Sequence, residues 1–185
     1  MMRISWVFAE GYQLSADIDA EKVKAVGSTW GSWRTWRSCS TDNVICHQRS
    51  SAQDLIARAF QSVCNFYIPA QHYQDLKRPI GVKLYQGAFD QEVDHIEDII
   101  AMHLVSTTSD LVLLVGFDFS PLTPVEDQFE QHKIKNYHGL IHSMIKSNPT
   151  VEWILIDHDA KLDKAYRSLP NLTCDKMKNA LQLLM

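Results

Sequence analysis

Residues Leu111 to Val115 form an unbroken apolar run that ends on Gly116 and is followed by an acid, Asp118. A short run of branched apolar residues with a glycine at its carboxyl end is typical of a strand buried on both faces, as in a parallel sheet covered by helices. In open α/β sheets, ligands bind just beyond the carboxyl ends of such strands. The segment therefore predicts both the class of fold and the edge of the sheet where a ligand would bind.

Short apolar runs of this kind alternate along the chain with stretches whose apolar residues follow the helical repeat. Strands are predicted at residues 4–9, 44–47, 65–68, 82–85, 111–115 and 151–156. Helices are predicted at residues 17–26, 52–63, 90–104, 128–146, 162–169 and 176–184. The segment 27–43 is predicted to be a structured loop with one helical turn at 33–37, and 172–175 to begin the tail. This alternation predicts an α/β fold: a single Rossmann-like domain over residues 1–185, with a mostly parallel open sheet and helices on both faces.

The composition narrows the class of partner. The chain of 185 residues carries a net charge of −4, which does not favour nucleic acid. Its apolar runs are shorter than a membrane span, and Glu10 interrupts the opening run before any signal-peptide cleavage site. The four cysteines lack Cys-x-x-Cys spacing and are expected to be reduced thiols: Cys39, Cys46, Cys64 and Cys174. We therefore predict a cytoplasmic protein with no membrane partner.

Four polar stretches directly follow predicted strands, at residues 10–12, 47–49, 116–118 and 157–159. Because the carboxyl ends of parallel strands meet at one edge of a sheet, these stretches are expected to line one crevice. Their ligand-binding candidates are Glu10, Gly11, Gly116, Asp118 and His158. The chain has neither a Gly-x-Gly-x-x-Gly fingerprint nor a P-loop, so the common dinucleotide and P-loop modes are disfavoured.

The candidates in these stretches each have an alternative interpretation. Gly11 opens a predicted helix that could bind phosphate through its free N–H groups, or it could be an ordinary tight turn. Asp118 could accept hydrogen bonds from a sugar diol, or it could cap the following loop. His158 stands between two acids, either of which could orient its ring.

Three tryptophans and two arginines alternate in one short segment: Trp30, Trp33, Arg34, Trp36 and Arg37. Tryptophan faces stack on bases and sugar rings, and arginine pairs bidentately with phosphate, which together predict a lid over a phosphorylated ligand. The same residue types are enriched at subunit interfaces, and tryptophans also fill cores. Ligand lid, interface and core therefore remain three interpretations of this segment.

The histidines supply candidates for proton transfer. His132 and His138 lie on one predicted helix, and either could act as a general base. His138 and His142 have the spacing of a metal pair, but no adjacent glutamate or third ligand accompanies them, so no metal site is predicted. His95 and His103 are expected to be packing residues.

The segment Gly116-Phe117-Asp118-Phe119 resembles the Gly-hydrophobic-Asp-Phe segment of sialyltransferase-like proteins, which comprise bacterial sialyltransferases and related phosphosugar- and pterin-acting domains. The resemblance implies a Rossmann-like fold, with nucleotide phosphates at the first glycine turn, Glu10-Gly11. It also implies a histidine base after the segment, at His132 or His138. The whole chain is similar to small uncharacterised proteins of tailed phages of marine bacteria, which would place it in the host cytoplasm and implies no activity.

Taken together, these patterns predict a transferase-like protein that binds or acts on a nucleotide, nucleotide sugar or phosphorylated sugar. The catalytic candidates are His132, His138 and Asp118. The ligand-binding candidates are Glu10, Gly11, Trp33, Arg34, Trp36, Arg37, Gly116, Asp118 and His158. The sequence identifies no cofactor. The alternative is a non-catalytic phage accessory protein, oligomeric or partner-binding, that uses the Trp/Arg segment as an interface.

Overall fold

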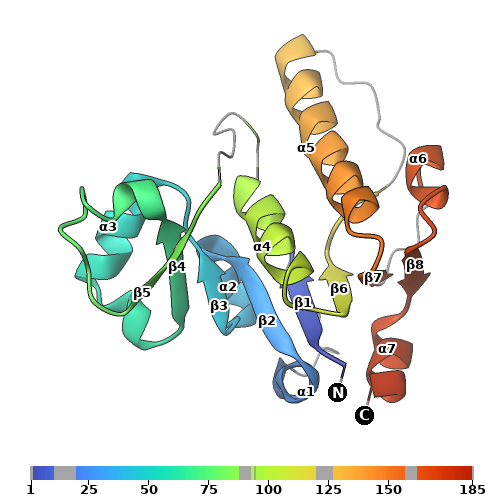
Figure 1. Ribbon diagram of the computed structural model, residues 1–185, viewed down its shortest axis with the longest axis horizontal. Helices are drawn as coiled ribbons and strands as arrows, with labels where there is room; N and C mark the ends of the chain where they lie inside the picture. The colour runs from blue at the N-terminus through green and yellow to red at the C-terminus, as the bar shows by residue number, and fades with distance from the viewer. Residues whose placement is uncertain are drawn as a thin grey trace.

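The computed structural model describes residues 2–10, 20–87, 93, 95–119, 127–156 and 162–184. The sheet has eight strands, all parallel, in the order β5-β4-β3-β2-β1-β6-β7-β8 (Figure 1). The strands are β1 (Ile4–Phe8), β2 (Ser28–Ser32), β3 (Asn43–Ile45), β4 (Asn65–Pro69), β5 (Val82–Tyr85), β6 (Leu111–Val115), β7 (Glu152–Ile156) and β8 (Leu172–Asp175). The predicted α/β fold with a parallel open sheet is confirmed.

Helices connect the strands and cover both faces of the sheet (Figure 1). The helices are α1 (Ala20–Val26), α2 (Trp33–Cys39), α3 (Arg49–Ala57), α4 (Ile96–Ser106), α5 (Gln128–Ser147), α6 (Lys164–Arg167) and α7 (Met177–Leu184), with 3-10 turns η1 (Phe60–Ser62) and η2 (Ala70–His72). No helix in these ranges is long and apolar enough to cross a membrane.

Alternation along β1 shows how the two faces are filled. Val7 packs in the core under α4 and α5, together with Ile100 and Ile141. Trp6 and Phe8 point to the opposite face, where residues of α1 and α7 complete a second core. Because side chains alternate along a strand, consecutive apolar residues such as Trp6-Val7-Phe8 supply both cores at once. The apolar runs in β1 and β6 therefore reflect the central position of these strands.

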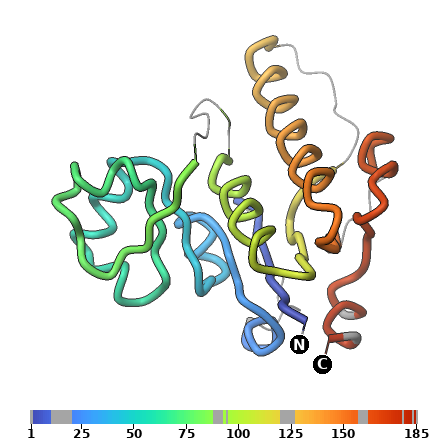
Figure 2. Tube along the Cα trace, viewed as in Figure 1, coloured from blue at the N-terminus to red at the C-terminus, as the bar shows by residue number. Residues whose placement is uncertain are grey.

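The direction of strand addition reverses between β1 and β6. From β1 the chain adds β2 to β5 on one side, and then returns to place β6, β7 and β8 on the other. Helix α4 makes this return, running from the carboxyl edge of the sheet to its amino edge and packing on β1 and β2 (Figure 2). Ligands of doubly wound sheets bind at such a reversal, beyond the carboxyl ends of the strands. The start of α4 is thus placed at the edge where a ligand is expected.

The prediction of a loop over residues 27–43 is wrong, although its helical turn at 33–37 is confirmed within α2. The segment Ser28-Thr-Trp-Gly-Ser32 forms β2, paired on both sides. The strand contains polar side chains, so a search for apolar runs does not detect it. These side chains are satisfied by hydrogen bonds. Ser28 Oγ lies 2.7 Å from Ser5 Oγ, and Thr29 donates to Asp42 at 2.8 Å. Ser32 accepts from the Thr35 N–H at 3.1 Å and so begins α2.

Other predicted boundaries are also corrected. Helix α3 ends at Ala57, earlier than the predicted residue 63, because Ala59 adopts a left-handed φ of 55°. Helix α4 begins at Ile96 rather than at residue 90, directly after His95 with the same φ of 55°. Residues 172–175 form the edge strand β8 and not a tail.

Helix α5 runs without a break through Gly139, so this glycine offers a test of the helix. A Cβ built there meets no atom within 4 Å. We expect Gly139→Ala to raise the free energy of unfolding by about 0.5–1 kcal/mol, because alanine loses less backbone entropy in a helix interior. Urea unfolding measures the change. Gly31→Ala is the contrasting variant and should not stabilise the protein, since its Cβ would lie 3.1 Å from Thr35 Cγ2. Destabilisation by Gly139→Ala would contradict the expectation.

Candidate functional site

A cavity of about 760 Å³ opens at the carboxyl edge of the sheet, between the starts of α3 and α4. This volume falls in the range of small-molecule sites. We call it the carboxyl-edge cavity; its polar lining includes Arg34, His47, Arg49, His72, His95 and Glu97. Among the described lining residues, two arginines and three histidines accompany one carboxyl group, so basic side chains predominate in this part of the lining.

Glu97 supplies the carboxyl group among the described residues of this lining, and its environment shifts it towards the neutral form. Glu97 is 5% exposed, and burial raises the pKa of its carboxyl group. The backbone N–H of His47 donates to Glu97 Oε1 at 3.2 Å and partly offsets that burial. A carboxyl group held neutral can donate a proton or a hydrogen bond, which an ordinary glutamate at neutral pH cannot.

The first turn of α3 forms one wall of the cavity through Gln48, Arg49 and Ser50. Gln48 holds the N-cap position but makes no side-chain cap hydrogen bond, and the first turn contains no acidic residue. The first N–H groups of a helix have no intrahelical acceptor, and the helix dipole adds positive potential there. This end of α3 therefore has the electrostatic character of an anion site.

His47 lies directly before this turn and is almost fully buried, with 4% of its surface exposed. Its Nδ1 lies 2.7 Å from the Tyr85 hydroxyl oxygen, while its Nε2 is buried and has no hydrogen-bond partner among the described residues. Burial lowers the pKa of His47, and His72 lowers it further, so the ring is neutral near pH 7. An unsatisfied buried polar atom costs about 1–3 kcal/mol, so Nε2 is a natural point of attachment for a ligand.

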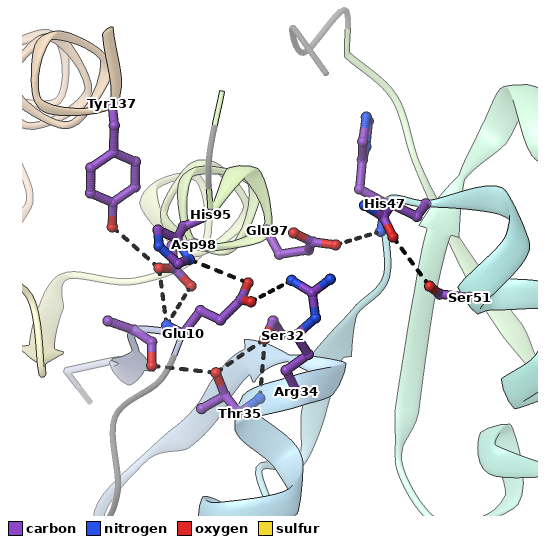
Figure 3. Close-up of polar contacts among 12 residues, drawn as sticks. Glu10, Ser32, Arg34, Thr35, His47, Ser51, His95, Glu97, Asp98 and Tyr137 are labelled. Atoms are coloured by element: carbon purple, nitrogen blue, oxygen red, sulfur yellow. Dashed lines mark hydrogen bonds and ion pairs between the residues drawn. The ribbon is translucent and has the colours of Figure 1, made fainter. Parts of the chain in front are cut away.

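Next to the cavity, at the reversal between β1 and β6, Glu10 contacts two basic side chains, Arg34 and His95 (Figure 3). Its Oε1 pairs with the Arg34 guanidinium, and its Oε2 lies 3.5 Å from His95 Nδ1. Burial alone would raise the pKa of Glu10, but the contacts with His95 and Arg34 outweigh it and lower the pKa. Glu10 is thus an anion that fixes the position of Arg34 at the cavity wall.

Asp98 lies beside the Glu10 backbone and is 1% exposed (Figure 3). Both of its carboxyl oxygens lie 3.1 Å from the Glu10 backbone nitrogen, and the Tyr137 hydroxyl donates to Oδ2 at 3.2 Å. Burial raises the pKa of Asp98 to about 7, although these hydrogen bonds act in the opposite direction. One carboxyl group therefore connects the end of β1, the start of α4 and the middle of α5.

A second cavity, of about 380 Å³, lies between α5 and α6 and is lined by His138, His142, Asp163 and Tyr166. The Tyr166 hydroxyl donates to the His138 carbonyl oxygen at 2.9 Å and lies 3.2 Å from His138 Nδ1. Burial lowers the pKa of His138, while Asp118 and Asp163 act to raise it. His138 is therefore a neutral base near pH 7, with Asp118 close enough to influence it.

The structure brings together only some of the predicted site residues. Glu10 and Arg34 form a direct pair, and Asp118 acts electrostatically on His138. Gly116, with a left-handed φ of 79°, turns the chain out of β6. His132 is exposed nearer the start of α5, 3.1 Å from Asn136 Nδ2. Predicted contacts at Gly11 and His158 lie outside the described residues.

The aromatic part of the Trp/Arg segment mainly packs inside the protein. Trp30 is buried in the core under α4. Trp33 and Trp36 are half-buried and pack against a third core beside β3 and β4. Arg37 lies over the Trp33 ring at 5.0 Å. Of the α2 side chains in the described cavity lining, it is Arg34 that faces the ligand space.

Sequence reasoning missed four contributors to this edge: Glu97, Asp98, Tyr137 and Tyr85. A signal existed for two of them, because Glu97 and Asp98 interrupt an otherwise apolar helical segment. His95 was expected to be a packing residue. This prediction is wrong, since its side chain is 48% exposed and lies at ion-pair distance from Glu10.

Other candidate chemistries find no support in the described ranges. No group of three or more His, Cys, Asp or Glu side chains is placed there to hold a metal ion. All four cysteines are free thiols, of which Cys39 and Cys46 are buried. Burial raises the pKa of Cys46 strongly, so this thiol is not activated.

Comparisons with known proteins add no family to this picture. No protein-family model matches the chain, and no curated protein or solved structure is significantly similar to it. The resemblance of Gly116–Phe119 to sialyltransferase-like proteins remains a prediction. The geometry of the carboxyl-edge cavity is therefore what supports a functional proposal.

Proposed function

We propose that the protein binds a phosphorylated small molecule, namely a nucleotide, nucleotide sugar or sugar phosphate, in the carboxyl-edge cavity. The observation that carries the proposal is the convergence of Arg34, Arg49 and the uncapped start of α3 on one cavity. All three provide N–H donors, and arginine matches the geometry of phosphate oxygens. Each arginine also pairs with a carboxylate, Arg34 with Glu10 and Arg49 with Asp75 at 3.2 Å, so a phosphate would share these guanidinium groups with the two acids. The cavity lies at the strand edge where doubly wound sheets bind ligands.

The same cavity contains groups suited to a transfer reaction. Burial raises the pKa of Glu97, which is the direction that suits a group donating a proton to a leaving oxygen. His47 is neutral and could exchange a proton through Nε2. We therefore propose transferase-like chemistry on the bound ligand, with Glu97 as the acid. His138, one of the two histidines expected from the sequence to act as base, and Asp118, expected to contact a hydroxyl, would serve a ligand that extends past β6 towards the second cavity.

The alternative is an interface at the Trp/Arg segment. Trp33 and Trp36 are half-buried against the core of this chain, which leaves less of their surface for a partner. Arg37 remains exposed beside them. A phosphorylated ligand is therefore the function that the described residues favour.

Replacement of Arg49 tests the proposal. A screen of melting temperature against AMP, UDP-glucose and glucose 1-phosphate would first identify a ligand, since saturation at a hundred times Kd adds about 2.7 kcal/mol of stability. We expect Arg49→Ala to weaken binding of that ligand about tenfold, because it removes one charge-assisted contact. Titration calorimetry measures the affinity.

Arg58→Ala is the matched control, because Arg58 is exposed at the opposite end of α3. Equal loss in the two variants would indicate a general effect of charge. A screen in which none of the three compounds raises the melting temperature would count against a phosphorylated ligand. In that case the cavity would have to serve another class of molecule.

A further inference from the structure

We infer that His47 donates a hydrogen bond from Nε2 to a phosphate oxygen bound at the start of α3, and that Tyr85 fixes the tautomer that makes this donor. The inference rests on the proposed function and assigns its phosphate subsite. His47 binds the ligand directly, and Tyr85 acts through His47 as a positioning residue. The subsite would comprise His47 Nε2, the Arg49 side chain and the first-turn N–H groups of α3.

The first support is the incomplete hydrogen bonding of His47. The side chain is 96% buried, lines the cavity and leaves Nε2 without a hydrogen-bond partner in the described part of the chain. Buried polar atoms are almost always paired in native proteins, so an unpaired one at a cavity wall points to a group that binds there. Its other ring nitrogen is already used by Tyr85.

The second support is the short distance between His47 Nδ1 and the Tyr85 hydroxyl, 2.7 Å. Hydrogen bonds donated by O–H are typically shorter than those donated by N–H, so this distance favours the tyrosine as donor. Burial raises the pKa of Tyr85, which keeps its proton in place. With Nδ1 accepting, the proton of a neutral imidazole stands on Nε2. His47 therefore presents an N–H donor to the cavity, which suits an anion.

The third support is the position of His47 in the chain. It directly precedes Gln48, the N-cap residue of α3, and His47 lines the same cavity as the first-turn residues Arg49 and Ser50. Glu97 accepts the His47 backbone N–H at 3.2 Å and fixes the same short segment from the α4 side. An anion bound at the start of α3 would thus accept hydrogen bonds from the first-turn N–H groups along the helix axis and from the His47 ring at one side.

The test compares His47→Ala with His47→Gln in the full-length protein. The probes are inorganic phosphate and AMP, with adenosine as the uncharged counterpart of AMP, each followed by titration calorimetry at constant ionic strength. We expect His47→Ala to weaken both phosphate-bearing probes about tenfold, as one hydrogen bond to a charged group is lost. His47→Gln should recover most of the affinity, because its amide N–H can occupy the place of Nε2–H.

Two outcomes separate this inference from the function on which it rests. If the wild type binds phosphate or AMP while His47→Ala binds equally well, or while His47→Gln loses as much as His47→Ala, the inference is overturned and the proposed function stands. If the wild type binds neither probe, the phosphate subsite is overturned; if it also binds neither UDP-glucose nor glucose 1-phosphate, the proposed function is overturned with it.

Nitrogen-15 NMR of the wild type provides a second readout that does not depend on the folding of variants. The proton of neutral His47 is expected on Nε2, and its resonance should shift when phosphate is added. Tyr85→Phe should move proton population to Nδ1, a change that a purely packing role of Tyr85 would not produce. A proton found on Nδ1 in the phosphate-bound wild type would overturn the inference.

Discussion

Between pH 5 and pH 8 the wild type is expected to lose about 3 kcal/mol of stability relative to the Asp98→Asn protein. Burial raises the pKa of Asp98 from 3.8 to about 7. Between these two values the folded protein binds more protons than the unfolded chain, so its stability falls as the pH rises. The contribution is complete below about pH 4 and is lost as the pH passes through 7.

Asparagine is a suitable replacement because it retains the shape and the acceptor of Asp98. Its amide oxygen can still accept from the Glu10 N–H, which lies 3.1 Å from both carboxyl oxygens of Asp98. It carries no charge, so it cannot suffer the burial that penalises the carboxylate. The neighbouring groups that titrate or carry charge, Glu10, His95 and Tyr137, are common to both proteins and cancel in the comparison.

Urea unfolding at pH 5, 6, 7 and 8 measures the two pH profiles. Asp110→Asn is the control, since Asp110 is an exposed acid whose pKa is lowered to about 2 by hydrogen bonds from Arg3. Its protonation does not change between pH 5 and pH 8, so its profile should be parallel to that of the wild type. Parallel profiles for wild type and Asp98→Asn would show that Asp98 remains charged in the fold.

The protonation state of Asp98 should also affect ligand binding at the carboxyl-edge cavity. The carboxyl group holds the backbone of Glu10, and Glu10 in turn holds Arg34 at the wall of the cavity. Charging Asp98 places a second anion beside Glu10, which favours contacts with cations at this edge. Ligand affinity and Asp98 protonation are therefore expected to be linked.

How far the fold could be read from the sequence depends on how each strand is buried. Strand β6 is apolar at every position and buried at every position, so its pattern reports its environment directly. Strand β2 is also central and almost fully buried, yet it reads as polar. Its serines and threonine are satisfied by partners such as Ser5 and Asp42, which are distant in sequence. Tertiary hydrogen bonding of this kind leaves no periodic signal.

The sequence predicted the edge of the sheet at which the site lies, but not which residues pair with one another there. Glu10 and Arg34 were each identified, because one follows a strand and the other lies in an unusual segment. Their pairing was not, since it arises from the adjacency of β1 and β2 in the sheet. Asp98 was missed because an acid on a helix is usually solvated, whereas here it meets the end of a strand 88 residues away. Contacts between distant elements are set by topology.

The substitution Arg34→Met is expected to raise the pKa of Glu10 and to weaken binding of a phosphorylated ligand by tenfold or more, about the effect of one lost charge-assisted contact. Burial pushes the pKa of Glu10 upwards, and Arg34 is one of two groups that hold it down. Without the guanidinium, burial is opposed by His95 alone. Carbon-13 NMR of the glutamate carboxyl groups measures this pKa, and titration calorimetry measures the affinity.

Arg37→Met provides a closely matched control for this variant. Both arginines belong to α2 and both lie over the Trp33 ring, at 5.3 Å for Arg34 and 5.0 Å for Arg37, so either substitution removes one similar aromatic contact and one charge. Arg34 also reaches Glu10 and the cavity lining. Arg37→Met should therefore leave the pKa of Glu10 and the affinity unchanged. Equal losses of affinity in the two variants would mean that net charge, and not the position of Arg34, attracts the ligand. An unchanged Glu10 pKa in Arg34→Met would show that this pair does not organise the edge of the sheet.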